Sequence, residues 1–429
     1  MANRIKSSLS KIPQLVFLTI SFFFQNNLDA CASACAFSFI FSFFPILVLV
    51  LTLFVRFLHI SPAMLSDLNL LLSEVTPYVD VHKIMDALPD GFVLTWGNLF
   101  LLLFVIWMAR KLFLSIIKGL LQIFNEVAPS RPVLNQLFTF LGEFIIVILS
   151  ALAFFAAFIT RQIFTMPFFS VIAERFPFLF STFSNRLVNW TLYAILFFSS
   201  VIAYRFGPGT KPKHRSCILC AFLATTIFTV VIFLISSFMN HANYNTLYGV
   251  LGKIIILLFE VYIFFFLFML FAQLLYSIQF FDTLVLGELY TLPEWESGII
   301  ASIRHKLFNT PLSLMTRENT FTVLAGKTIF SEHEEVSCVY YISFGSVCES
   351  RGEMKNLHYK GSFFGEFELM LGMNRLGSAV ALTDCRLIKI KKEDFAHMIE
   401  KNPVATSKAM STLSSYSAKF YGRNNGILI

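Results

Sequence analysis

Six long apolar stretches occupy the first two thirds of the chain, and they constrain the fold more than any other feature. About 20 apolar residues of α-helix cross a bilayer, and the helix satisfies its own backbone hydrogen bonds there. Only 14% of the 429 residues are charged, whereas soluble domains carry about 25%. The sequence therefore predicts an α-helical polytopic membrane domain. The predicted spans are residues 30–57, 92–108, 134–159, 188–204, 217–239 and 250–281.

The charged residues between the spans predict their orientation. The segment after the first span is acidic, with Lys83 as its only Lys or Arg. Basic residues gather in cytoplasmic loops, and here they follow the second span and join the fourth to the fifth; a weaker basic cluster between the third and fourth spans opposes this assignment. We expect a multi-pass protein of the inner (cytoplasmic) membrane with both termini cytoplasmic. The basic residues used are Arg110, Lys111, Lys118, Arg131, Arg205, Lys211, Lys213 and Arg215.

Two further features follow from this topology. The net charge of +7 is explained by the loops, so we expect the lipid bilayer as a partner and no nucleic acid. The apolar run at 12–24 follows three basic residues, as in a signal peptide, but it leads into another span instead of a polar domain. We therefore expect it to be an uncleaved amphipathic helix.

Polar side chains inside the predicted spans are candidates for function. Glu143 and Glu260 are acids at membrane depth, Lys253 begins the same helix as Glu260, and Gln273 lies further along it. An ionisable group in lipid is costly and usually faces a cavity or a partner. Two interpretations stay open: the acids line a path for a solute or ion, or they only pack against neighbouring helices, with Lys253 as an anchor at the membrane surface.

Several ordered motifs resemble a known family. They are ACAFSFIFSFFP at 34–45, WMAR at 107–110 with GL at 119–120, YN at 244–245 and YGVLG at 248–252. Together they are similar to the YihY/BrkB inner-membrane family. The resemblance implies a six-span domain over residues 1–282, linked with envelope integrity and a proposed transport role. Where the family has an acid near the end of the last span this chain has Gln273, and Glu260 replaces an aromatic residue.

The chain becomes polar after residue 282. Residues 283–304 suggest a linker, 305–420 a second domain of short alternating strands with flanking helices, and 421–429 a tail. The segment FGEFELMLGMNRLGS at 364–378 suggests a phosphate-binding cassette. Gly365 permits a tight turn, Glu366 can accept a hydrogen bond from a ribose hydroxyl, and Arg375 can neutralise a phosphate. Ser378 and the Ala379 N–H would complete the cradle.

This cassette and its flanking strands resemble the cyclic nucleotide-binding fold. The resemblance implies a β jelly-roll barrel with flanking helices and cyclic AMP or cyclic GMP as a regulatory ligand; no cofactor is certain. The family's Pro-Arg-Ala-Ala segment is here Asn374-Arg375-Leu376-Gly377. Two interpretations therefore stay open, a nucleotide-binding barrel and a ligand-free docking module.

The sequence does not predict an enzyme. The eight histidines are dispersed without metal-ligand spacing, and no nucleophile-elbow or phosphate-loop motif is present, so we expect no catalytic residue and no metal. Two functions remain. One is a transporter or exporter regulated by a cytoplasmic nucleotide sensor. The other is a non-transporting envelope-integrity or scaffold protein. A homo-oligomer is compatible with both.

Overall fold

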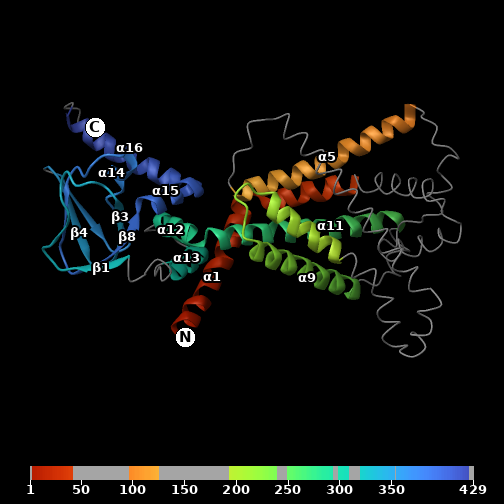
Figure 1. The fold of residues 1–429 in the computed structure, drawn as a ribbon, viewed down its shortest axis with the longest axis horizontal. Helices are drawn as coiled ribbons and strands as arrows, with labels where there is room; N and C mark the ends of the chain where they lie inside the picture. Colours follow the sequence, from red (N-terminus) through yellow and green to blue (C-terminus); the bar gives the residue numbers. More distant parts are fainter. Residues whose placement is uncertain are drawn as a thin grey trace. The chain divides into compact units, whose positions relative to one another are not determined.

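The computed structural model describes residues 2–41, 96–124, 193–238, 249–292, 298–308, 319–352 and 354–424. The chain divides into two compact units, one from 20 to 276 and one that joins 1–19 to 277–429. In Figure 1 the regular elements described for the first unit are helices, whereas the second combines helices with β-strands. A helical region followed by a β domain is the order that the sequence predicts.

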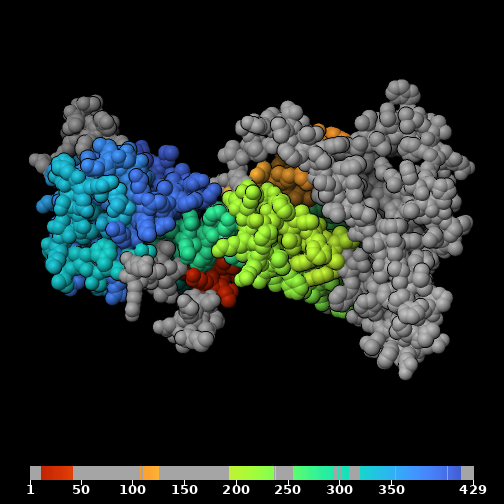
Figure 2. Space-filling model, in the orientation of Figure 1, coloured from red at the N-terminus to blue at the C-terminus, as the bar shows by residue number. Residues whose placement is uncertain are grey.

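Long apolar helices make up the described part of the unit from 20 to 276. They include α5 (Trp96–Phe124), a helix at Tyr193–Phe206, α9 (His214–Phe238) and α11 (Gly249–Gln279). Two stretches, His214–Ile235 and Ile255–Gln279, are long and apolar enough to cross a membrane. Large apolar side chains such as Phe222 and Phe233 are exposed on α9, which Figure 2 shows at the surface in yellow-green. A continuous apolar face of this kind is expected where a helix meets lipid.

The first helix of the chain ends in a sharp bend. α1 (Ala2–Gln25) contains the amphipathic helix predicted at 12–24. Its part Lys11–Gln25 meets the helix Leu28–Phe41 at 65°, and only together do the two satisfy the length and hydropathy of a span. Asn27 has a φ of 48°, a left-handed conformation that Asn tolerates better than most residues. The Gln122 side chain donates a hydrogen bond of 2.7 Å to the Asn26 carbonyl and so supports the turn.

Helices α5 and α11 pack closely around a small residue. A Cβ atom on Gly119 would lie 2.6 Å from the terminal carbon of Met269, which would have to move. One turn further along α5, Phe124 is fully buried and its ring lies 5.5 Å from that of Tyr276. Gly119 therefore lies at a tight contact between two helices.

The described helices agree with part of the predicted topology. The predicted spans 217–239 and 250–281 correspond to α9 and α11, although α11 ends at Gln279. Residues 30–41, 96–108 and 193–204 are helical parts of three further predicted spans. The predicted span at 134–159, including Glu143, lies outside the described residues. A helical membrane region is thus supported, and six crossings are not established.

In the described residues of the second unit, eight antiparallel strands form two sheets. The strand orders are β1-β8-β3-β6 and β2-β7-β4-β5, as in an eight-stranded jelly roll. The strands are β1 (Thr320–Val323), β2 (Thr328–Phe330), β3 (Cys338–Phe344), β4 (Ser346–Arg351), β5 (Met354–Tyr359), β6 (Phe363–Phe364), β7 (Ser378–Ala381) and β8 (Cys385–Lys391).

Alternation along the strands builds two hydrophobic cores. Tyr340 and Ile342 of β3 join a core with residues of both sheets, among them Phe364. Val339 and Tyr341, one position out of phase, join a second core with residues from the helices. Successive strand residues point to opposite faces, so β3 is buried on both. Both faces of β3 are therefore covered from Cys338 to Ile342.

Five helices accompany the barrel in the part of the chain from residue 281 that the structure describes. They are α12 (Phe281–Thr291), α13 (Ile299–Phe308), α14 (Glu366–Leu371), α15 (Lys392–Lys401) and α16 (Pro403–Asn424). Leu286, Leu289 and Tyr290 of α12 are buried in the second core. An ion pair of 2.6 Å between Arg304 and Glu288 joins α13 to α12. The sequence suggests a linker at 283–304, and the described parts of this range, 283–292 and 298–304, contribute side chains to the packing of this unit.

Candidate functional site

The cassette begins with a turn that requires glycine. Gly365 follows β6 directly and precedes α14, with a φ of 76°. Side chains are strained in this left-handed region. A Cβ atom at this position would also lie 2.5 Å from Nη1 of Arg375. Glycine therefore serves both the backbone turn and the close approach of the guanidinium, as the sequence pattern predicts for the turn.

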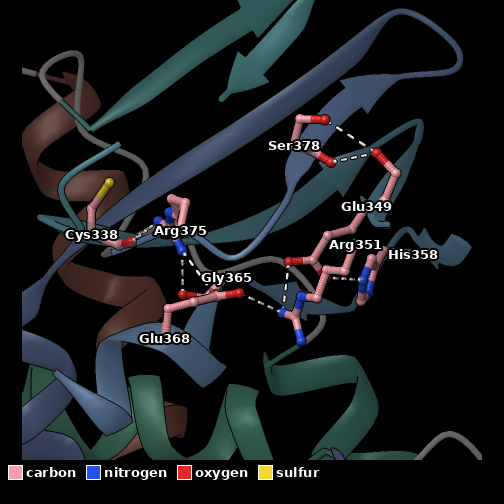
Figure 3. A network of polar contacts seen from close by, with 9 residues as sticks. Cys338, Glu349, Arg351, His358, Gly365, Glu368, Arg375 and Ser378 are labelled. Carbon is pink, nitrogen blue, oxygen red and sulfur yellow. Dashed lines mark hydrogen bonds and ion pairs between the residues drawn. The ribbon is translucent and has the colours of Figure 1, made fainter. Parts of the chain in front are cut away.

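Arg375, the predicted phosphate ligand, is enclosed by protein groups (Figure 3). It is 2% exposed, and its guanidinium donates hydrogen bonds of 2.6 Å to the carbonyl oxygens of Gly365 and Cys338. A third contact of 3.5 Å joins Nη1 to a carboxylate oxygen of Glu368. The same group lies 4.1 Å from the centre of the Phe330 ring. The cation is thus placed next to the Gly365 turn, with protein acceptors around it.

Glu366, the predicted ribose contact, begins α14 and is 7% exposed. Burial raises the pKa of its carboxyl group; its own backbone N–H works against the rise, and the nearby Glu349 adds to it. A buried carboxyl with a raised pKa retains its proton to higher pH, and in that form it can donate as well as accept a hydrogen bond.

Ser378 and Ala379 lie at the start of β7. The Ser378 hydroxyl is 3.1 Å from that of Ser350, and the Ser350 hydroxyl also donates to the Ser378 carbonyl at 3.2 Å. Ala379 is fully buried and opposes Glu349 in the register of β4 and β7. The structure thus places Gly365 in contact with Arg375, whereas the contacts of Ser378 and Ala379 described above are to β4.

Gly377 has a steric role that its position in the sequence does not reveal. A Cβ atom there would collide with the Ser350 carbonyl and with the side chain of Arg351. Glycine at this position allows the loop to lie directly against β4.

A buried charge network surrounds the cassette, and no sequence motif predicted it. Arg351 lies 2.9 Å from Glu349 and 2.9 Å from Glu368, and Nε2 of His358 lies 3.1 Å from the other oxygen of Glu349 (Figure 3). Glu349 and Arg351 alternate with exposed or partly exposed residues on β4, so both point inward. The sequence signal that pointed to this network is the presence of two charged residues at inward positions of one barrel strand.

The charges of this network determine which groups are ionised. Burial opposes the ionisation of Glu349, but the hydrogen bond from His358 and the charge of Arg351 outweigh it and lower the pKa of this carboxyl. Arg351 is further enclosed by aromatic rings, with its guanidinium carbon 5.0 Å from the centre of Phe367 and 4.9 Å from that of Tyr416. A paired guanidinium of this kind is fixed in place.

The polar candidates in the helical unit differ in burial and in how far the structure describes them. Gln273 is fully buried on α11, and neither atom of its amide has a hydrogen-bond partner in the described structure. Glu260 lies on the same helix and is partly buried. The side chain of Lys253 and all of Glu143 lie outside the described residues. Within the described ranges, no cluster of His, Cys, Asp and Glu is arranged to hold a metal ion.

Comparison with known families decides the class of the protein. A family model described as "Virulence factor BrkB" matches residues 19–282, more than half of the chain. The chain belongs to this family. A second model, "Cyclic nucleotide-binding domain", matches residues 320–402, which include the Gly365 turn and Arg375. This BrkB-family membrane protein therefore carries a cyclic nucleotide-binding domain, and neither matched family is enzymatic.

Individual relatives match the second domain. A "cGMP-dependent 3',5'-cGMP phosphodiesterase A" of Dictyostelium discoideum is 34% identical over 70 residues. The match spans 16% of this chain and only 8% of the length of that relative. The phosphodiesterase match lies within the binding domain.

Among solved structures, the catabolite activator protein of Thermus thermophilus is 23% identical, with a TM-score of 0.22, over 25% of this chain and 53% of its own. A protein from a study of a cyclic-GMP-dependent signalling pathway in bacterial phytopathogenesis also has 23% identity and a TM-score of 0.22, over 25% and 91%. The cAMP-bound EAL enzyme Bd1971 has 24% identity and a TM-score of 0.21, over 25% and 30%.

Proposed function

We propose that this BrkB-family protein is a membrane transporter or exporter whose cytoplasmic domain binds a cyclic nucleotide and thereby regulates it. The observation that carries the proposal is the Gly365 turn beside Arg375 and Glu366 in a jelly-roll barrel. This arrangement places one guanidinium and one carboxyl group at the same turn. A cyclic nucleotide needs both, because its phosphodiester is an anion and its ribose carries a 2′-hydroxyl.

In the proposed complex Arg375 binds the cyclic phosphate and Glu366 the ribose hydroxyl. Ser378 and the Ala379 N–H complete the anion site. The present contacts of Arg375 are to two carbonyl oxygens and one carboxylate, so the guanidinium must exchange at least one of them for the phosphate. Cyclic AMP and cyclic GMP share these phosphate and ribose groups, so these residues select neither base.

Helix α12 supports a route from the cassette to the membrane helices. Tyr290 of α12 contacts Phe363, which lies two residues before Gly365, with ring centres 5.1 Å apart. The Tyr290 carbonyl accepts a hydrogen bond of 2.6 Å from Lys408 of α16. Along the chain, α12 follows α11 after the single residue Phe280. A movement of the cassette would change the packing of Tyr290 and so bias the position of α12.

Gln273 supports transport more than a purely structural role. An amide buried without hydrogen bonds reduces stability. Such a group is easier to understand if it contacts a solute during part of a transport cycle. We further propose that the protein lies in the inner membrane with several crossings and with both termini in the cytoplasm, as the loop charges suggest.

The first test is ligand binding by the full chain in lipid nanodiscs. Titration calorimetry with cyclic AMP, cyclic GMP and cyclic dinucleotides should give saturable binding that Arg375→Ala abolishes. Arg386→Ala is the matched control, because Arg386 is exposed on β8 and outside the cassette. Absence of binding by folded protein, or equal loss in both variants, would contradict the sensor.

Regulation needs a separate measurement. Hydrogen–deuterium exchange of α11 and α12 should change when the nucleotide saturates the protein, and proteoliposomes holding a potassium gradient should show a ligand-dependent change in ion flux. An unchanged exchange pattern in α12 would argue against the proposed route. If hydrogen–deuterium exchange changes but the potassium flux does not, the result would argue against potassium as the solute and would still support regulation by the nucleotide.

One observation favours a second function, a ligand-free docking barrel in a scaffold protein. The guanidinium of Arg375 already donates to Gly365, Cys338 and Glu368 without a ligand. If the calorimetry shows no ligand and the barrel remains folded, this interpretation replaces the first.

A further inference from the structure

Glu368 is a buried carboxylate in contact with the cation that the proposed ligand needs. It lies on α14, two residues after Glu366, and has no exposed surface. One of its oxygens is 3.5 Å from Nη1 of Arg375, and the other is 2.9 Å from Nη2 of Arg351. Figure 3 shows Glu368 between the two guanidinium groups. A single carboxylate therefore contacts both cations of the network.

The two guanidinium groups and two of the carboxylates of the network contact one another without a ligand. Glu349 pairs with Arg351, and Glu368 supplies a negative charge to Arg375. A cyclic phosphodiester is also singly negative, so it would enter beside a carboxylate that already compensates the cation. Like charges a few ångströms apart repel strongly where water is excluded. Ligand binding at Arg375 is thus opposed for as long as Glu368 remains beside it.

The hydrogen bonding of Glu368 suggests that this position is not its most stable one. Its contact with Arg375 is long for a charge-assisted hydrogen bond, which usually measures about 2.7–2.9 Å. Its other oxygen is close to Arg351 but has no hydrogen-bond partner in the described structure. A carboxylate held by charge and only weakly by hydrogen bonds can change partner at low cost. Arg351 is already within reach to receive it.

We propose that Glu368 is an internal competitor for Arg375 that sets the affinity of the barrel for a cyclic nucleotide. In the unliganded barrel Glu368 occupies the position of the anion. When the ligand binds, the phosphate takes Arg375 and Glu368 pairs with Arg351 alone. This inference rests on the proposed function, because it concerns the same site and ligand.

The test compares nucleotide affinity of full-length variants in nanodiscs. Glu368→Gln removes the charge and keeps the shape, so cyclic AMP or cyclic GMP should bind about tenfold to a hundredfold more tightly than to the wild-type chain. Glu368→Ala should give a similar gain. Glu349→Gln is the matched control: it removes a charge from the same network at a residue that pairs with Arg351 and His358, and it should give a smaller gain.

The outcomes separate this inference from the proposed function. A gain that Arg375→Ala cancels supports the inference, and it does so even where the wild-type chain shows no detectable binding. Wild-type binding with equal or weaker binding by Glu368→Gln overturns the inference and leaves the sensor intact. No binding by any folded variant overturns both. Damage to the fold cannot imitate the expected result, because it would lower affinity.

Discussion

The two units of the chain bury polar side chains in opposite ways. In the barrel, buried charges contact each other: Arg351 meets Glu349 and Glu368, and Arg375 meets Glu368. In the helical unit, Gln273 is buried with neither amide atom hydrogen-bonded in the described structure. The barrel therefore encloses a network of charged residues that contact one another, whereas α11 carries a buried amide whose presence stability does not explain.

The strongest test of the paired network removes its central cation. Arg351→Met should lower the free energy of unfolding of the barrel by about 3–5 kcal/mol, because two buried carboxylates each lose a guanidinium partner. Chemical denaturation followed by a probe in the barrel measures this change. Arg386→Met, at an exposed position of β8, should change it by less than about 0.5 kcal/mol. Similar small effects for both would mean that the network contributes little.

The next largest effect concerns the turn that places Arg375. Gly365→Ala should cost about 1–3 kcal/mol for the positive φ and should additionally displace the Arg375 side chain. Gly372→Ala is the matched control, since Gly372 has a φ of 67° but no atom lies within 4 Å of an added Cβ. Unfolding measurements should show a greater loss for Gly365→Ala, and calorimetry should show lost ligand binding for it alone. Equal losses would remove the steric argument.

The sequence predicted the elements that hydrophobic pattern alone determines. The short alternating strands expected in the second domain are confirmed, with β3 and β8 among them, and two of the predicted spans correspond to α9 and α11. Helix α12 was not predicted, because Gly287 and the acidic residues near it resemble a linker. Its apolar face is explained only by the barrel helices against which it packs.

Two further details depended on three-dimensional contacts. The flanking helix that follows β8 is divided into α15 and α16 at Asn402, whose side chain accepts hydrogen bonds from the N–H groups of Val404 and Ala405. Asn before Pro is a helix-start signal that could have shown this break. The charge network could not be predicted, because its members come from β4, β5 and α14 and their pairing requires the folded barrel.

Two glutamines of the helical unit allow a direct comparison, since among the described residues Gln122 is hydrogen-bonded and Gln273 is not. Gln122→Leu should lower stability by about 1–2 kcal/mol, because Gln122 donates a hydrogen bond to the Asn26 carbonyl at the bend. Gln273→Leu should leave stability unchanged or raise it by about 0.5–1 kcal/mol, because it removes an unsatisfied amide. Thermal unfolding in nanodiscs measures both. A clear loss for Gln273→Leu would show that this amide has a structural partner.

The smallest expected effect depends on pH and concerns Glu366. Unlike Glu349, this buried carboxyl of the barrel has a raised pKa. Burial raises its pKa above the ordinary value of 4.5, so the folded domain holds this proton more firmly than the unfolded chain does. The stability that Glu366 contributes is therefore complete below about pH 4.5 and is lost as the pH rises through the folded pKa. Glu366→Gln should match the wild type in acid and become relatively more stable above that range. Denaturation curves between about pH 4 and pH 8 measure the difference.

The same variant links this pH dependence to the ligand. Since Glu366 is the proposed ribose contact, Glu366→Gln should also bind nucleotide less well than the wild-type chain. A buried carboxyl whose charge is not fully compensated by hydrogen bonds or cations lowers stability. A gain in stability together with that loss in affinity would therefore show that Glu366 serves ligand binding and not stability. Parallel denaturation curves at all pH values would instead show that Glu366 is as well compensated as its charged neighbours.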